Sequence, residues 1–148
     1  METFISRLDV RWADIDANFH VLHSKYYDYA ATCRMEFLTL HGLSMQVMQE
    51  YHIGPILFRE ECSFKKEIRF GDQVSVTFKV SKASENFARW SIEHEIYKNG
   101  DQLAAITSID AAWMDTQRRK LVVPPPVIQS IFEKAPKSEN FHFISGKK

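Results

Sequence analysis

Four side chains suited to acid–base chemistry lie within seven residues near the start of the chain: Asp14, Asp16, Asn18 and His20. A carboxylate can act as a general base or a nucleophile, an imidazole can move a proton near neutral pH, and a carboxamide can orient either group. The segment lies between a strand pattern and an amphipathic helix pattern, so the first N–H groups of that helix follow it closely. Because such N–H groups can stabilise an oxyanion, the segment holds the minimum set for acyl transfer.

Each of these residues also has a purely structural interpretation. An aspartate is common in turns, so Asp16 could cap the loop, and we expect Asp14 to be a turn or cap acid. Asn18 tolerates left-handed backbone angles, and His20 could be a hydrogen-bonded loop histidine. The pair His20-x-x-His23 lacks a third ligand, so we predict no metal site.

The flanking elements are readable from residue spacing. Residues 3–12 alternate as a half-buried strand, and Ser24 is the expected N-cap of a helix ending near Leu40. A short helix is expected over 44–51, strands over 55–69, 74–80, 87–97 and 103–113, and a last short helix over 127–135. The tail, 136–148, is expected to be loosely held. The apolar face of the long helix is formed by Tyr26, Ala30, Cys33, Phe37 and Leu40.

This order predicts an α+β architecture in which one long helix packs against consecutive antiparallel strands. A length of 148 residues fits a single domain, with a core over about 4–126 and a C-terminal extension over 127–148. A sheet that curls around the helix would bury one face of each.

Composition excludes several classes of protein. The 19 basic and 19 acidic residues balance, which argues against a nucleic-acid partner. No stretch reaches the ~18 apolar residues of a membrane span, and no signal peptide is evident, so we expect a cytoplasmic protein without a membrane partner.

Cys33 and Cys62 are expected to be buried free thiols. A G-x-S-x-G motif is lacking, which argues against a serine hydrolase. Asp110 interrupts an apolar strand and is expected to face solvent or a subunit partner.

Several short motifs, in this order, resemble the hotdog fold of the 4-hydroxybenzoyl-CoA thioesterase-like superfamily. They are Val10-Arg11-Trp12, Asp14-Ile15-Asp16, His20-Val21, Tyr26, Arg34 and Ile68-Arg69-Phe70-Gly71-Asp72. The resemblance implies a curved antiparallel sheet of about five strands wrapped around one long helix. It also implies that Asp16 is the catalytic carboxylate and that a backbone N–H at about His23 polarises the thioester carbonyl.

The chain also resembles the plant acyl-carrier-protein thioesterases, whose D-x-N-x-H constellation matches Asp16, Asn18 and His20. Those enzymes carry a further acid in the next strand. Two registers place it at Glu61 or at Glu67, and we prefer Glu67 as the additional catalytic residue.

The pattern departs from many relatives at Phe19, where they have glycine. This residue is expected either to keep ordinary backbone angles or to protrude into a pocket. With Tyr26, Phe19 is therefore a candidate substrate-binding residue.

The function implied by the resemblance is hydrolysis of an acyl-CoA or acyl-carrier-protein thioester. CoA or phosphopantetheine would enter as part of the substrate, with no separate cofactor. A homodimer or homotetramer is expected, and an acyl carrier protein is a possible partner.

The candidate phosphate contacts are Arg59, Lys65, Lys66, Arg69, Arg89, Arg118, Arg119 and Lys120. The alternatives are a non-catalytic acyl-thioester-binding protein and a hotdog dehydratase, whose helix-borne histidine signature is not evident.

Overall fold

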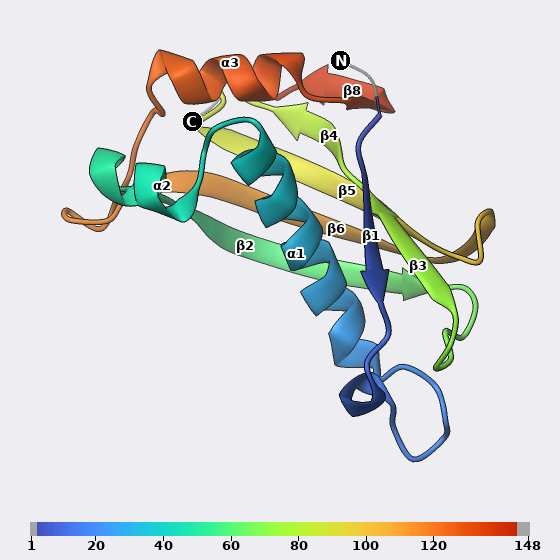
Figure 1. Ribbon diagram of the computed structural model, residues 1–148. Coiled ribbons are helices and arrows are strands. Elements are labelled where there is room, and N and C mark those ends of the chain that lie inside the picture. Colours follow the sequence, from blue (N-terminus) through green and yellow to red (C-terminus); the bar gives the residue numbers. More distant parts are fainter. Residues whose placement is uncertain (1–2, 145–148) are drawn as a thin grey trace.

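The computed structural model describes residues 3–144, so the ends of the predicted 1–148 domain, 1–2 and 145–148, lie outside it. Figure 1 shows its helices and strands in chain order. They are β1 (Ile5–Asp9), the 3-10 helix η1 (Trp12–Asp14), α1 (His23–Leu40), α2 (Met45–Tyr51), β2 (Ile53–Phe64), β3 (Gln73–Thr77), β4 (Lys79–Ala83), β5 (Arg89–Lys98), β6 (Gln102–Asp115), β7 (Lys120–Leu121), α3 (Pro126–Lys134) and β8 (Lys137–Phe143).

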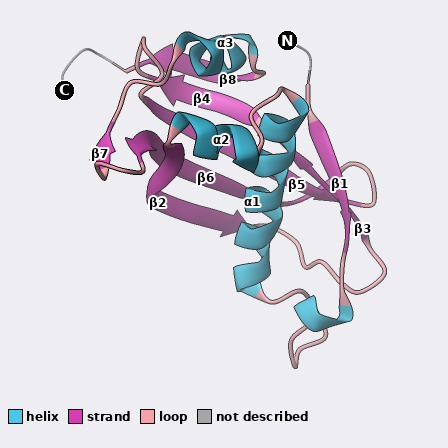
Figure 2. Ribbon diagram, turned by 60° about the vertical axis from the view of Figure 1, so that its left-hand side comes forward, coloured by secondary structure: helices cyan, strands magenta, loops and turns pink. Residues whose placement is uncertain are grey.

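All of these strands join one curled sheet, and α1 crosses it (Figures 1 and 2). Strand β6 pairs with β2 on one side and β5 on the other, and β5 then pairs with both β3 and β4. β1 extends the sheet beyond β3, and β8 extends it beyond β4. The predicted α+β hotdog fold, with a curved antiparallel sheet around a long helix, is confirmed.

The strand expected over 74–80 is present as two strands that meet at Phe78. The four alternating apolar residues Val74, Val76, Phe78 and Val80 are all buried, as their spacing predicted. Both β3 and β4 pair with β5, and the register of the β4–β5 pairing shifts after Val80. The break therefore bends the strand without turning its apolar side chains away from the core.

The start of α1 differs from the prediction. Leu22 is the N-cap, in an extended conformation and without a side-chain cap, and the helix begins at His23. Ser24 is therefore the second helical residue and not the cap. The shift brings the first turn of the helix two residues closer to the polar loop.

The apolar face of α1 is largely as predicted. Tyr26, Ala30, Cys33 and Phe37 are buried, whereas Leu40 is 67% exposed because it lies in the last turn. The Phe37 ring stacks on Phe78 of the sheet at a centroid distance of 4.0 Å. This contact holds the C-terminal end of α1 against the sheet where β3 and β4 meet.

The expected loose tail is wrong for residues 137–143, which form β8. This strand pairs in parallel with β4, the only parallel pairing between the described strands. The preceding helix α3 buries Phe132 against Trp90 and Trp113, with ring centroids 5.0 and 5.8 Å away. The tail had no clear alternation of apolar residues, and the free edge of β4 supplies the hydrogen bonds that order it.

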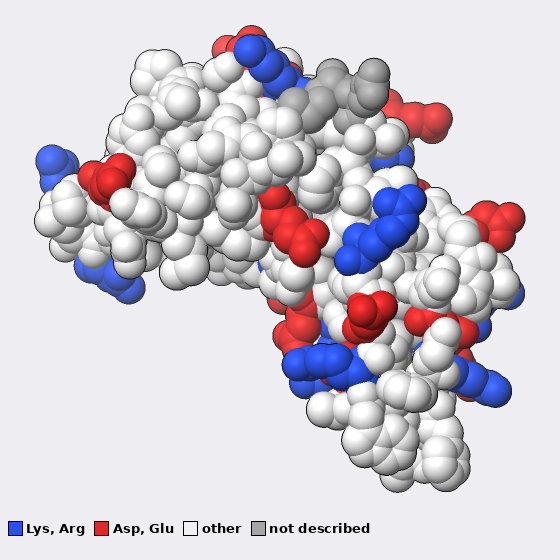
Figure 3. Space-filling model, viewed as in Figure 1, with Lys and Arg blue, Asp and Glu red and all other residues white. Residues whose placement is uncertain are grey.

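Charges of both signs are interspersed on the face shown in Figure 3. None of the helices between residues 3 and 144 is long and apolar enough to cross a membrane. The Asp110 side chain is 37% exposed and accepts a hydrogen bond of 2.6 Å from Ser91. The expectation that this acid faces away from the core is confirmed.

Candidate active site

Asp14 anchors the segment that carries the polar cluster. Its side chain is fully buried, and one carboxylate oxygen accepts the backbone N–H of Arg11 at 3.0 Å and the hydroxyl of Tyr29 at 2.9 Å. The other oxygen accepts the Arg11 guanidinium at 2.8 and 3.2 Å. Burial raises the pKa of Asp14, but the bonds from Arg11 and Tyr29 outweigh it and leave the pKa below its ordinary value. Asp14 is therefore the structural cap acid that its position in the turn predicted.

Asp16 lies two residues further on, in a tight loop closed by a bridge between Ile15 and Val21. Its Oδ1 accepts the backbone N–H of Asn18 at 2.9 Å and that of His20 at 3.4 Å. Its Oδ2 lies 3.5 Å from Nδ1 of His20, which is beyond a good hydrogen bond. The loop backbone thus fixes one carboxylate oxygen and leaves the second beside the imidazole.

The structure separates Asn18 and Phe19 from this cluster. Asn18 is exposed and contributes its backbone N–H, while its carboxamide contacts neither Asp16 nor another described side chain. Phe19 has a left-handed φ of 68°, and its side chain is 77% exposed. The phenylalanine therefore takes the backbone angle that favours glycine, and it neither keeps ordinary angles nor enters the pocket described below, as had been expected.

The start of α1 supplies hydrogen-bond donors. Within residues 3–144, the N–H groups of His23 and Ser24 have no acceptor, whereas the next one, from Lys25, bonds to Leu22. A free first turn carries the positive end of the helix dipole. These two N–H groups are therefore available to an oxygen atom of a ligand.

Asp16 and the helix start line the same pocket, whose volume is about 340 Å³. Its walls come from the loop, from the first turn of α1 and from the end of β2 with the segment after it. The lining residues are Asp16, His20, Val21, His23, Tyr26, Phe64, Lys65, Lys66 and Glu67. Asp16, His20 and the first residue of α1, His23, thus line one concave site, an arrangement that suits acyl transfer.

The two candidates for the additional acid lie in different places. Glu67 lines the pocket, where its Oε1 is 3.2 Å from Nη2 of Arg69, whereas Glu61 lies on β2 and pairs with Arg59. Tyr26 also lines the pocket and is only 4% exposed, and burial raises the pKa of its hydroxyl. Its ring meets Phe64 edge to face at 5.0 Å.

Phe64 and Val21 were not predicted as site residues. Phe64 ends β2, and the pattern over 55–69 had no clean phase that would show which of its residues face the helix. Lys65 and Lys66, two of the candidate cations, line the pocket beside them and have no ion-pair partner in the part of the chain that the structure describes. No group of three or more metal-ligating side chains occurs between residues 3 and 144.

The pattern of residues 10–132 matches the family model described as the thioesterase-like superfamily. The chain belongs to this superfamily. A curated protein of Aquifex aeolicus, named as a candidate esterase, is 30% identical over 81 residues. That match spans 55% of this chain and 63% of the Aquifex protein, less than two thirds of its length.

Solved structures of superfamily relatives confirm the fold. A 1,4-dihydroxy-2-naphthoyl-CoA thioesterase from Synechocystis superposes with a TM-score of 0.80 at 21% identity, covering 90% of this chain and 97% of the other. A Staphylococcus aureus protein of unassigned function, solved in complex with CoA, superposes with a TM-score of 0.82 at 19% identity, covering 99% and 94%. At these identities the likeness is one of fold.

Proposed function

We propose that this protein hydrolyses acyl-CoA thioesters, with Asp16 as the catalytic carboxylate and the N–H of His23 as the oxyanion donor. The observation that carries the proposal is that the Asp16 carboxylate and the unpaired first turn of α1 line one pocket. Membership of the thioesterase-like superfamily supports the reaction class. The products would be a free acid and the CoA thiol.

In this scheme the thioester oxygen lies against the N–H of His23, where the helix dipole favours its growing negative charge. Asp16 then takes a proton from the attacking water, or attacks the carbonyl carbon to form an anhydride that water cleaves. The backbone bonds from Asn18 and His20 hold one carboxylate oxygen, so the other is free to react. His20 lies beside that free oxygen and orients it.

CoA is the carrier that the comparisons favour. The Synechocystis relative is named as a CoA thioesterase, and the Staphylococcus relative was solved with CoA bound. The adjacent Lys65 and Lys66 line the pocket without carboxylate partners among the described residues, which suits a substrate with several phosphates. An acyl carrier protein stays as the alternative carrier.

We also propose that the protein forms a homodimer or homotetramer. Strand β2 is 12 residues long and pairs only with β6 among the described strands, so its outer edge is free. Leu57 and Phe58 on this strand are 40% and 53% exposed. A long edge with exposed apolar residues is protected when a second copy pairs with it.

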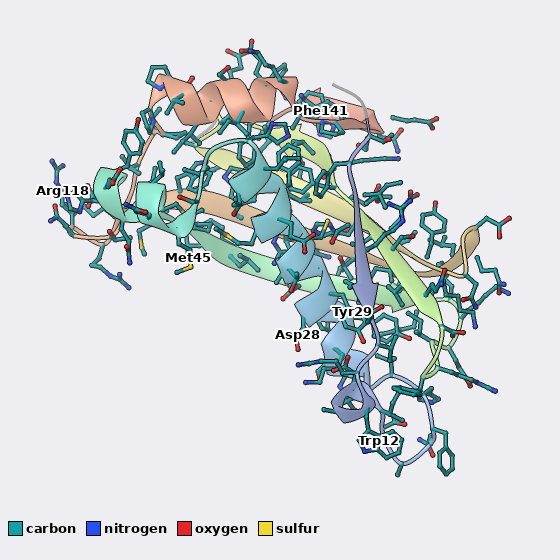
Figure 4. All side chains as sticks on the ribbon, viewed as in Figure 1. Trp12, Asp28, Tyr29, Met45, Arg118 and Phe141 are labelled. Atoms are coloured by element: carbon teal, nitrogen blue, oxygen red, sulfur yellow. The ribbon has the colours of Figure 1, made fainter. Side chains whose placement is uncertain are left out.

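The Asp16→Asn variant tests the proposed reaction. Asparagine keeps the shape of the side chain but cannot accept a proton, so the loss of a general base predicts that kcat falls by roughly 10²- to 10⁴-fold. Release of free thiol from benzoyl-CoA, butyryl-CoA and palmitoyl-CoA measures it. The matched control is Asp28→Asn, an exposed acid on α1 outside the pocket (Figure 4), which is expected to keep wild-type turnover.

Full turnover by Asp16→Asn would refute the assigned role. If wild type and Asp16→Asn both bind the acyl-CoA substrates without hydrolysing them, the non-catalytic binding function replaces the enzyme. Calorimetry on the same proteins separates these results, because it reports affinity whether or not turnover occurs.

A further inference from the structure

Two large aromatic side chains stand exposed beside the candidate active site. Trp12 is 74% exposed and Phe70 is 60% exposed, and their rings meet edge to face at a centroid distance of 6.2 Å. The other two tryptophans, Trp90 and Trp113, are buried in the core. Figure 4 shows Trp12 at the lower end of the molecule, where the same view in Figure 3 shows an uncharged surface. Exposed aromatic rings that pair only with each other commonly mark a binding surface.

Both rings are held in place by buried or hydrogen-bonded acids. Trp12 begins the 3-10 helix that Asp14 ties to Arg11 and Tyr29. Phe70 lies in a turn in which Asp72 accepts the backbone N–H of Arg69 at 2.8 Å. Because these anchors fix the backbone on either side, the aromatic pair is preorganised, and a ligand that stacks on it need not order the chain.

The aromatic pair is close to the pocket. Phe70 follows Lys66 by four residues and Trp12 precedes Asp16 by four, so each lies within roughly 14 Å of a pocket residue along an extended chain. The two segments are joined by the bond from the N–H of Val21 to the carbonyl of Ile68, at 2.7 Å. A pantetheine arm has the backbone length of about four amino acid residues, roughly 13–14 Å when extended. Because roughly 14 Å is an upper limit, the phosphates at the end of such an arm can lie before Trp12, and the adenine beyond them can reach its ring.

The charges along this path suit a nucleotide. Lys65 and Lys66 line the pocket, and no carboxylate of residues 3–144 pairs with either. An edge-to-face pair covers one ring face at most, so the indole of Trp12 keeps a free face for a planar base. Two free cations followed by a free aromatic face match phosphates followed by a heterocyclic base.

We propose that Trp12, supported by Phe70, is the stacking platform for the adenine of CoA. The inference rests on the proposed thioesterase function and deepens it, since a phosphopantetheine arm on a carrier protein has no adenine to stack. Trp12 then acts in binding and specificity and takes no part in the bond changes at the thioester. The platform thus selects CoA over carrier-protein substrates.

The kinetic test compares two substrates that differ only in the nucleotide: butyryl-CoA and butyryl-pantetheine. For Trp12→Ala, kcat/KM with butyryl-CoA is expected to fall between roughly 5-fold and 150-fold, the measured range for loss of one base–aromatic stack. With butyryl-pantetheine, kcat/KM is expected to stay unchanged. Trp12→Phe keeps an aromatic face and should restore most of the loss.

The matched control is Phe143→Ala, which removes a half-exposed aromatic ring on β8, outside the pocket lining. This control variant is expected to leave kcat/KM unchanged for both substrates. Equal effects of Trp12→Ala on the two substrates, or no effect on either, overturn the platform. A change in sedimentation coefficient caused by Trp12→Ala also overturns it, because the ring would then be a contact between copies of this chain.

A binding measurement keeps the proposal testable without turnover. Acrylamide quenching of tryptophan fluorescence reaches the exposed Trp12 and not the buried Trp90 and Trp113. Saturating 3′,5′-ADP carries adenine and phosphates but no thioester. It is expected to protect the fluorescence of Trp12 from quenching by acrylamide. Protection without hydrolysis of any thioester supports the platform while refuting the proposed function. Hydrolysis without protection refutes the platform alone.

Discussion

The buried histidine on β5 predicts a specific acid sensitivity. His94 is fully buried, with Nδ1 at 2.7 Å from the carbonyl oxygen of Thr77 and Nε2 at 3.2 Å from Nη1 of Arg34. The carbonyl only accepts and the guanidinium only donates, so the neutral ring carries its proton on Nδ1 and accepts at Nε2. A second proton would point at the guanidinium and place a charge in the core.

Burial and the neighbouring Arg34 charge lower the pKa of His94 to about 3, against the opposing effect of the Thr77 bond. The unfolded chain binds this proton near pH 6.5, whereas the folded protein binds it only near pH 3. Between these limits the unfolded state carries one proton more, so the free energy of unfolding falls as the pH falls. One proton gives a slope of about 1.4 kcal/mol per pH unit. At pH 6.5 the unfolded histidine is only half protonated, so between pH 6.5 and 4.5 the loss is about 2.3 kcal/mol, a large part of a usual total of about 5–15 kcal/mol.

The assay is urea unfolding at several values between pH 6.5 and 4.5, for wild type and His94→Gln. Glutamine can donate to Thr77 and accept from Arg34 but takes up no proton, so the stability difference between the two proteins should change by about 1.4 kcal/mol per pH unit. His142→Gln, at an exposed histidine on β8, is the matched control and should show no such change. Carboxylates begin to bind protons at the lower end of this window, but they do so in both proteins, so their contribution cancels in the difference between wild type and variant. A difference that is constant across the window would refute the assigned tautomer and burial.

Two further predictions concern the active-site loop. Phe19→Gly is expected to be more stable than Phe19→Ala by about 0.5–1 kcal/mol, because both remove the same exposed ring and only glycine adopts a φ of 68° without steric cost; equal urea midpoints would contradict the strain argument. Asp14→Asn is expected to lower the free energy of unfolding by about 2 kcal/mol, since an amide cannot accept all the bonds from Arg11 and Tyr29. Thermal unfolding checks it, and unchanged stability would show that these bonds do not anchor the loop.

The core of the fold was predictable because its signals are local. The alternation of Val74, Val76, Phe78 and Val80 and the helical spacing of Tyr26, Cys33 and Phe37 each follow from one element burying one face. The same holds for one half of the candidate site. Asp16 and His23 are seven residues apart, so a strand–loop–helix unit brings them together whatever the rest of the chain does.

The opposite wall of the pocket could not be predicted from local residue spacing. Phe64, Lys65 and Lys66 lie far from Asp16 in the sequence. The pairing of β2 with β6 and the bond from Val21 to Ile68 place them beside the start of α1. Glu61 and Glu67 were both compatible with the sequence. Among the residues of β2 and the segment after it, those that line the pocket are Phe64 to Glu67, so Glu67 lies at the pocket and Glu61 does not; a catalytic role for Glu67 stays a prediction.

The sequence by itself determined the fold class, the catalytic-type loop and the helix that follows it, since residue periodicity and short-range spacing encode them directly. Tertiary structure decided the pairing of β8 with β4 and the closeness of Trp12 to Phe70. Each of these depends on contacts between segments distant in the chain. Such contacts are selected by packing and by free sheet edges, and no local pattern of residues records them.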